Sequence, residues 1–302
     1  VFDRLERART RRTLERYVSK DVAGELLDNP ESYLNSLGGV RKPVTILFSD
    51  LRGFTTRTES APDPHALVAQ LNEYLNEMVR IVFARTGTLD KFIGDAVMAH
   101  WGSITSVDVQ TDARQAVQAA LDMRKVLPAL NEGWKKRGID PLYFGVGINH
   151  GEAIVGNLGC EAKMEVSAIG DAVNTASRLE GVTKIYHLDL VIGEPVEPLV
   201  RDVFILRSVD CILLQGKTKP MKIFTVLSER SAGAAPDWLA THEQAVVLYR
   251  LGDFAAAEAN WNEVLAALPG DPLAPVFIKR CQNLRANPPG DAWNGVFEMS
   301  SK

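Results

Sequence analysis

The sequence predicts an α+β fold, because strand and helix patterns alternate along its 302 residues and the strand patterns are short. Amphipathic helix patterns cover residues 65–85, 108–137 and 171–183. Strand patterns cover residues 44–49, 89–92, 97–101, 142–149, 152–156, 164–169, 189–192 and 222–227. Residues 144–154 contain several glycines but lack the spacing of a dinucleotide fingerprint, so we interpret them as a strand pair.

Two aspartates stand where strand patterns end. Residues 44–48 form an apolar run that leads directly to Ser49 and Asp50, and residues 93–96 place Gly94 and Asp95 at the tip of a predicted hairpin. An aspartate after a strand is more often a turn or capping residue than a ligand. If the fold brings the two carboxylates together, however, they repel each other unless a hard divalent cation lies between them. Metal-assisted phosphoryl chemistry is therefore the first hypothesis.

The residues after Asp50 strengthen this hypothesis. Gly53 lies in a short turn that leads through polar residues to the amphipathic stretch at 66–85. Glycine lets a backbone approach a ligand closely, and the N–H groups that open a helix bind phosphate oxygens. Strand, carboxylate, glycine turn and helix together predict a cradle for a metal ion and a triphosphate.

Three ordered motifs resemble the core motifs of class III nucleotidyl cyclases. They are Phe48-Ser-Asp-Leu-Arg-Gly-Phe-Thr55, Lys91-Phe-Ile-Gly-Asp-Ala-Val-Met98 and Ile169-Gly-Asp-Ala-Val-Asn-Thr-Ala-Ser-Arg178. The resemblance covers residues 41–228 and implies a ferredoxin-like βαββαβ palm as the catalytic domain. By this division, residues 1–40 are an N-terminal helical linker or transducer, 229–236 a linker, and 237–302 a C-terminal helical appendage.

The resemblance also implies residue roles. Asp50, Asp95 and the backbone of Leu51 match the ligands of two divalent cations, Mg²⁺ or Mn²⁺. Asn174 matches the residue that orients the ribose, and Arg178 the arginine that meets charge in the transition state. Without the surrounding motif, this pair would be interpreted as polar residues on a solvated helix face. The backbone of Gly53, Phe54 and Thr55 matches the triphosphate-binding turn.

In the family, the metal aspartates and the Asn–Arg pair come from opposite chains of a dimer. This chain carries both sets, so the resemblance implies a homodimer with two shared active sites.

Lys91 and Ser167 match the positions that choose the base, and they favour ATP over GTP. A lysine donates hydrogen bonds, which suits N1 of adenine, whereas guanylyl cyclases carry glutamate there. A serine hydroxyl can accept from the adenine amino group, but it can also donate, so Ser167 weakens the discrimination. The serine resembles a bacterial subgroup with Ser or Thr at this position, several members of which respond to bicarbonate.

Two positions depart from the family pattern. Gln215 replaces the first lysine of a Lys-Gly-Lys segment that touches the triphosphate, and Lys217 or Lys219 could substitute for it. Gly145 replaces an arginine that some members carry. We therefore expect modest affinity for the triphosphate. The competing hypotheses are a guanylyl cyclase and a catalytically silent nucleotide-binding module.

The C-terminal part resembles one tetratricopeptide helix pair, at residues 245–265. One such pair cannot bury its own apolar face, so it must dock on the catalytic core, a partner subunit or another protein. We favour docking over peptide recognition.

Composition and charge limit the remaining possibilities. A net charge of −4 does not indicate a nucleic-acid surface. The three cysteines have no metal-ligand spacing, and we interpret the five histidines as structural. Arginines crowd the first sixteen residues, as on a solvated helix face or beside a bilayer. The stretch Arg16-Tyr-Val-Ser-Lys-Asp-Val-Ala-Gly-Glu-Leu-Leu27 resembles the segment before the catalytic domain in family members that often carry an extracellular sensor and membrane helices upstream. This resemblance implies that the chain is the cytoplasmic part of a membrane-anchored sensor protein.

Overall fold

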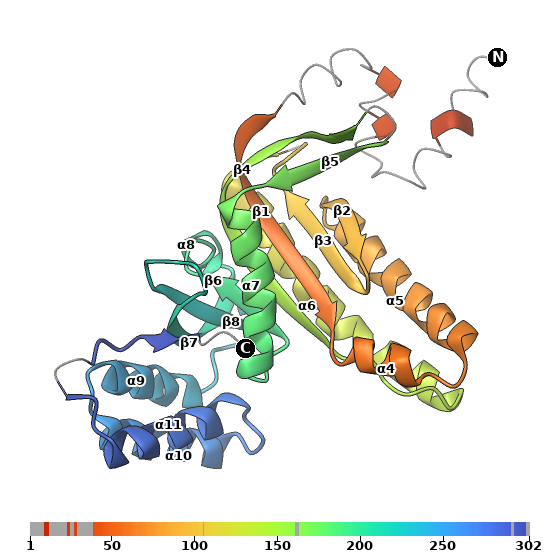
Figure 1. Ribbon diagram of the computed structural model, residues 1–302. Helices are drawn as coiled ribbons and strands as arrows, with labels where there is room; N and C mark the ends of the chain where they lie inside the picture. The colour runs from red at the N-terminus through yellow and green to blue at the C-terminus, as the bar shows by residue number, and fades with distance from the viewer. Residues whose placement is uncertain are drawn as a thin grey trace. The chain divides into compact units, whose positions relative to one another are not determined.

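The computed structural model describes residues 9–11, 23–24, 27–28, 39–104, 106–160, 163–290 and 293–299 (Figure 1). The helices expected within residues 1–40 therefore lie almost entirely outside the described residues. The chain divides into two compact units, Val1–Phe144 with Ile148–Ser177, and Gly145–Gly147 with Arg178–Lys302. Within the described ranges, none of the helices is both long and apolar enough to cross a membrane.

The first unit confirms the ferredoxin-like expectation. Its strands follow the order β2-β3-β1-β4, with β5 paired to β4, and its elements run in the βαββαβ sequence, with the short helix α4 and the strand β5 in addition. These elements are β1 (Val40–Leu51), α4 (Phe54–Ser60), α5 (Pro64–Ala84), β2 (Thr88–Ile93), β3 (Ala96–Trp101), α6 (Val109–Lys136), β4 (Phe144–Cys160) and β5 (Lys163–Ile169).

Alternation along β1 divides its side chains between the two faces of the sheet. Val44, Ile46 and Phe48 pack in one apolar cluster with the first turns of α7 (Asp171–Ile185). On the other face, the Ser49 hydroxyl lies 3.2 Å from the hydroxyl of Tyr74 on α5. Because both faces of β1 are buried, the strand is held firmly up to Asp50.

The β2–β3 hairpin contains a bulge at Asp90. Leu89 pairs with Ala99, but Lys91 pairs with Met98, so one residue of β2 has no partner opposite it. A bulge bends the strand and re-aims its side chains. As a result, the adjacent Asp90 and Lys91 both reach the same group of polar residues, which strict alternation would not allow.

One sequence expectation about this unit was wrong. The glycine-rich residues 144–154 form part of a single strand, β4 (Phe144–Cys160), rather than a strand pair. The two-residue turns that usually join hairpin strands need a residue at positive φ, and neither Gly147 nor Gly151 has one. The strand that pairs with the far half of β4 is β5, with Gly156 opposite Ser167.

The second unit contains the end of α7 and a sheet of order β6-β8-β7-β9. The sequence did not predict β7, because Arg207 and Asp210 interrupt its apolar pattern although both are buried. The elements are β6 (Leu190–Gly193), α8 (Glu197–Val200), β7 (Phe204–Leu213), β8 (Met221–Glu229), η1 (Arg230–Ala232), α9 (Trp238–Arg250), α10 (Phe254–Ala267), α11 (Leu273–Ala286) and β9 (Phe297–Glu298).

The C-terminal part has three helices rather than the expected hairpin, and they bury their apolar faces within the second unit. Tyr249, Trp261 and Phe277 of α9, α10 and α11 share one core cluster with Val209 of β7 and Leu179 of α7. The Trp261 and Phe277 rings stack at 4.5 Å between centroids. Docking on the same chain therefore covers the face that one helix pair would leave exposed.

Two arginines, Arg207, which is buried, and Arg280, which is largely buried, fasten α11 and the loop before it to β7. Arg207 binds both oxygens of Asp271, at 2.6 and 2.8 Å. Arg280 binds Asp210 at 2.6 Å, and the Tyr186 hydroxyl just beyond α7 donates to the same carboxylate at 2.6 Å. The carboxylate of Asp210 on β7 thus joins α11 to the residue that follows α7.

His242 of α9 is buried as a neutral ring whose tautomer is set by its neighbours. Its Nδ1 accepts from Arg207 Nη2 at 3.1 Å and from Trp261 Nε1 at 3.3 Å, so Nε2 carries the proton and donates to the Ser208 carbonyl at 2.7 Å. Burial first, and the Arg207 charge next, lower the His242 pKa to about 4.

We expect this histidine to destabilise the fold in acid. The unfolded chain binds a proton near pH ~6.5, but the folded chain resists it until about pH 4, so stability falls between these values, by roughly 3 kcal/mol in total. Urea denaturation near neutral and near acidic pH should show a steeper loss for the wild type than for His242→Gln. His65→Gln, at an exposed position, is the control and should keep the wild-type slope. Equal slopes for the wild type and His242→Gln would contradict the assignment.

Candidate active site

The fold brings the two predicted metal aspartates together. Antiparallel pairing of β1 with β3, with Ser49 opposite Val97, puts Asp50 and Asp95 at the same edge of the sheet. The Leu51 N–H donates to Asp95 Oδ2 at 3.3 Å. Burial, followed by the charge of Asp50, raises the Asp95 pKa. The second of these causes is the carboxylate repulsion that the sequence predicted.

These residues fit a divalent cation. Their ligand atoms are all oxygen, which Mg²⁺ and Mn²⁺ prefer. A cation between the carboxylates would also remove the repulsion that contributes to the raised Asp95 pKa. Among the described residues, no three His, Cys, Asp or Glu side chains gather at one metal-sized site. A cation held by Asp50 and Asp95 would therefore complete its coordination with backbone oxygen, such as that of Leu51, and with substrate or water.

The turn after Asp50 has the conformation that its glycine predicts. Gly53 adopts φ 64° at the N-terminus of α4, a left-handed conformation that other residues rarely adopt. Phe54 is buried and anchors the turn, whereas Thr55 is exposed. A side chain at position 53 would meet no neighbouring atom, so glycine is required by the backbone angle rather than by crowding.

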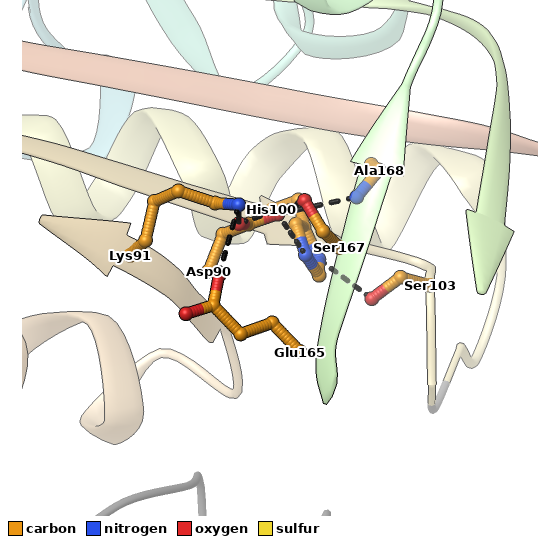
Figure 2. A network of polar contacts seen from close by, with 7 residues as sticks. All are labelled: Asp90, Lys91, His100, Ser103, Glu165, Ser167 and Ala168. Carbon is orange, nitrogen blue, oxygen red and sulfur yellow. Dashed lines mark hydrogen bonds and ion pairs between the residues drawn. The ribbon is translucent and has the colours of Figure 1, made fainter. Parts of the chain in front are cut away.

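Lys91 and Ser167 lie in one polar network, shown in Figure 2, although they are far apart in the sequence. Both contact Asp90. The Ser167 hydroxyl lies 2.9 and 2.8 Å from its two carboxylate oxygens, and Lys91 Nζ lies 3.4 Å from Oδ1. Lys91 also binds Glu165 at 3.2 Å. Although burial lowers the Lys91 pKa, the two carboxylates outweigh it, so the pKa is raised and the amine stays charged.

Asp90 is the centre of this network and was not predicted from the sequence. Its side chain is completely buried, with His100 Nε2 at 3.2 Å and the Ala168 N–H donating at 3.1 Å. The His100 contact is electrostatic rather than an aligned hydrogen bond, and Ser103 lies 2.6 Å from the other ring nitrogen. Burial raises the Asp90 pKa, but these neighbours and Ser167 outweigh it, so the pKa is lowered.

Two signals could have suggested additional members of the network. Glu165 stands two residues before Ser167 on β5, so the period of a strand puts both on one face. His100 could have been linked to β2 through the hairpin register, in which Thr88 is its partner. Asp90 itself has no such signal, because the bulge that turns it inward depends on tertiary structure.

Asn174 and Arg178 lie one turn apart on α7, as predicted. Asn174 is exposed and Arg178 half-buried, and neither side chain makes a hydrogen bond or ion pair with another described residue. An Arg178 Nη2 atom lies 3.5 Å from where a Cβ on Gly216 would stand. The Lys217 N–H closes a turn on the Leu214 carbonyl at 2.9 Å, so Arg178 lies beside the segment that carries Gln215 and Lys217.

Comparison with known proteins shows the family to which the catalytic part is similar. Residues 40–228 match the family described as the Adenylate and Guanylate cyclase catalytic domain. A relative in Dictyostelium discoideum, the terminal-differentiation specific adenylate cyclase, is 32% identical over 284 residues, which are 90% of this chain. The same match covers 13% of that relative, so this chain spans only a small part of its length.

Two solved structures are also similar. The adenylyl cyclase CyaB from P. aeruginosa is 36% identical with a TM-score of 0.61, over 66% of this chain and 100% of that one. A guanylyl cyclase is 33% identical with a TM-score of 0.57, over 64% of this chain and 95% of that one. With the family match over residues 40–228, these similarities establish that the chain belongs to the class III adenylate and guanylate cyclase catalytic domain family.

Proposed function

We propose that this chain is an adenylyl cyclase that converts ATP to 3′,5′-cyclic AMP and pyrophosphate at sites shared by two copies of the chain. The observation that carries the proposal is the pair of carboxylates, Asp50 and Asp95, held at one edge of the sheet with a raised Asp95 pKa. Repelling carboxylates at the end of a strand are suited to hold cations beside a triphosphate.

The reaction requires the ribose 3′-oxygen to attack the α-phosphorus in line with the leaving pyrophosphate. Two divalent cations bound by Asp50, Asp95 and the Leu51 backbone would favour deprotonation of that hydroxyl and neutralise the triphosphate. The backbone of Gly53, Phe54 and Thr55 would hold the outer phosphates through its N–H groups.

Charge that builds up on the α-phosphoryl oxygens needs a fixed donor. Arg178 suits this role, because it is half-buried and has no acidic partner among the described residues. Asn174, one turn earlier, would orient the ribose. Lys217 would contact the triphosphate in place of the family lysine that Gln215 replaces, and we expect the affinity for ATP to be modest for this reason.

The base preference follows from Lys91 and Ser167. Lys91 is charged and can only donate, which suits the unprotonated N1 of adenine and opposes the N1–H of guanine. Ser167 would accept from the adenine amino group. Because the similar structures include both an adenylyl and a guanylyl cyclase, this pair of residues is the basis for choosing ATP.

Two further parts of the proposal concern assembly and context. Two copies of this chain would join head to tail, so that Asn174 and Arg178 of one reach the triphosphate held by Asp50 and Asp95 of the other. We further propose that the domain acts in the cytoplasm as the output of a sensor protein anchored in a membrane. The resemblance around residues 1–40 and the much greater length of the Dictyostelium relative support this context.

An assay of both nucleotides tests the proposal. With Mn²⁺ or Mg²⁺, we expect cyclic AMP from ATP and at least ~10-fold lower kcat/KM for GTP. Product should be identified by chromatography, with EDTA as the control that abolishes turnover. Preference for GTP would establish the guanylyl cyclase alternative. Nucleotide binding by a dimer that turns over neither substrate would establish the silent signalling module.

A further inference from the structure

The Ser167 hydroxyl has an ambiguity that the structure resolves. A free serine hydroxyl can accept a hydrogen bond from the amino group of adenine or donate one to the 6-oxo group of guanine. In this chain, Ser167 Oγ lies 2.9 and 2.8 Å from the two oxygens of Asp90, well within hydrogen-bond distance of both. Figure 2 shows the hydroxyl directed at that carboxylate.

The Asp90 carboxylate is kept in its charged form by its surroundings. It is completely buried, and it faces the Ala168 N–H, the Lys91 ammonium and the His100 ring on three sides. These neighbours hold the Asp90 pKa below its usual value in spite of burial. A carboxylate in this form has no proton to give, so the hydrogen in its bond with Ser167 must come from the serine.

We propose that Asp90 is a positioning residue for base selection, which takes up the Ser167 proton in a hydrogen bond and leaves only the serine lone pairs for the base. The amino group of a 6-aminopurine can then donate a hydrogen bond to the serine oxygen. The oxygen of a 6-oxopurine cannot, because it and the serine oxygen would face each other as two acceptors. The inference rests on the proposed function, and it makes the serine as selective for adenine as a carboxylate would be.

The arrangement of the network fits this role. The Lys91 and Glu165 side chains are 35% and 36% exposed and form its solvent-facing edge, whereas Asp90 and Ser167 lie behind them. Gly156 is opposite Ser167 on β4 and has no side chain to cover the hydroxyl. A base that displaces Glu165 from Lys91 would therefore meet the Lys91 ammonium and the Ser167 oxygen together.

Asp90→Asn tests the inference, because an amide NH₂ group can donate a hydrogen bond to Ser167, whereas the carboxylate can only accept one from it. The amide oxygen should remain in the Oδ2 position opposite the Ala168 N–H, which needs an acceptor, so its NH₂ group takes the Oδ1 position, 2.9 Å from Ser167 Oγ. Ser167 can then accept from the NH₂ group, which frees the serine hydrogen for donation to a 6-oxo group. We expect the ratio of kcat/KM for ATP to that for GTP to fall about tenfold or more, mainly because GTP turnover rises.

Ser167→Ala provides a second measurement that leaves Asp90 in place, in case Asp90→Asn does not fold. If the hydroxyl only accepts, its removal should slow ATP turnover and spare GTP turnover, so the ratio falls again. If the hydroxyl were free to turn, it could serve both bases. Its removal would then lower kcat/KM for ATP and for GTP by the same factor, and the ratio would stay the same. In the double variant, the ratio should change no further than in Ser167→Ala alone.

Asp122→Asn is the matched control. Like Asp90→Asn, it removes a carboxylate that a cationic side chain contacts, here Arg85 at 2.7 Å, but at a position outside the network, so the ratio should remain that of the wild type. An unchanged ratio in Asp90→Asn, or in Ser167→Ala where Asp90→Asn does not fold, in an enzyme that makes cyclic AMP, would overturn the inference and leave the proposed function intact. A wild type that prefers GTP or is inactive would overturn both.

Discussion

Arg178→Ala and Asp95→Ala should each lower cyclic AMP production by at least ~10³-fold, and a mixture of the two should recover part of it. The arginine variant loses the donor for charge on the transferred phosphoryl group. The aspartate variant loses one of the two carboxylates that would hold the cations. Each is inactive for a different reason, and in the proposed dimer the two lesions lie on opposite sides of a shared site.

The recovery can be estimated from the symmetry of the dimer. After full exchange at equal concentrations, about half of the dimers are mixed. In a mixed dimer, one site receives both lesions and the other receives none, so it has one intact site of two. We therefore expect about a quarter of the wild-type rate. A steady-state assay of the two variants, alone and after exchange, provides the measurement.

Two controls make the result decisive. Arg201→Ala removes an exposed arginine whose ion pair with Glu197 is long, at 3.8 Å, and it should keep the wild-type rate. Subunit exchange should be followed with differently labelled chains. If labelled chains exchange fully and no activity returns, each site belongs to a single chain and the shared-site proposal fails.

The fold was predictable to the extent that local patterns reflect burial. The run from Val44 to Phe48 indicated a strand ending at Asp50, and the Gly94 turn indicated a hairpin, so the meeting of Asp50 with Asp95 could be expected. The interpretation of β4 as two strands was wrong because glycine permits a turn but does not require one. Strand β7 was missed because Arg207 and Asp210 are buried with partners that lie far away in the sequence.

The candidate site was predictable where a motif identified it and not where tertiary contacts create it. Lys91 and Ser167 come from motifs, and the structure places both on one network. Asp90, which connects them, lies next to Lys91 and would point to the opposite face of a regular strand. Only the bulge between Leu89 and Lys91 turns it towards Ser167. The pairing of β2 with β3 produces this bulge, and sequence periodicity does not indicate it.

Arg207→Met should lower the free energy of unfolding by about 3–5 kcal/mol. The Arg207 and Asp271 side chains are only 3% and 0% exposed, and the guanidinium binds both carboxylate oxygens. Burial raises the Asp271 pKa, but contact with Arg207 outweighs this, so the pKa is lowered. Without the arginine, a carboxylate would remain buried with its charge uncompensated, and His242 would lose a donor. Urea denaturation near neutral pH is the measurement.

Arg285→Met is the matched control for this prediction. Arg285 binds Glu258 at a similar distance, 2.7 Å, but its side chain is 54% exposed, so its loss should cost only about 0–1 kcal/mol. The double variant Arg207→Met with Asp271→Asn should recover part of the stability, because it removes the buried charge along with its partner. If Arg207→Met unfolds at the same urea concentration as Arg285→Met, this ion pair is not what holds the loop before α11 to β7. In that case the apolar cluster around Trp261 and Phe277 would be enough to fasten the C-terminal helices.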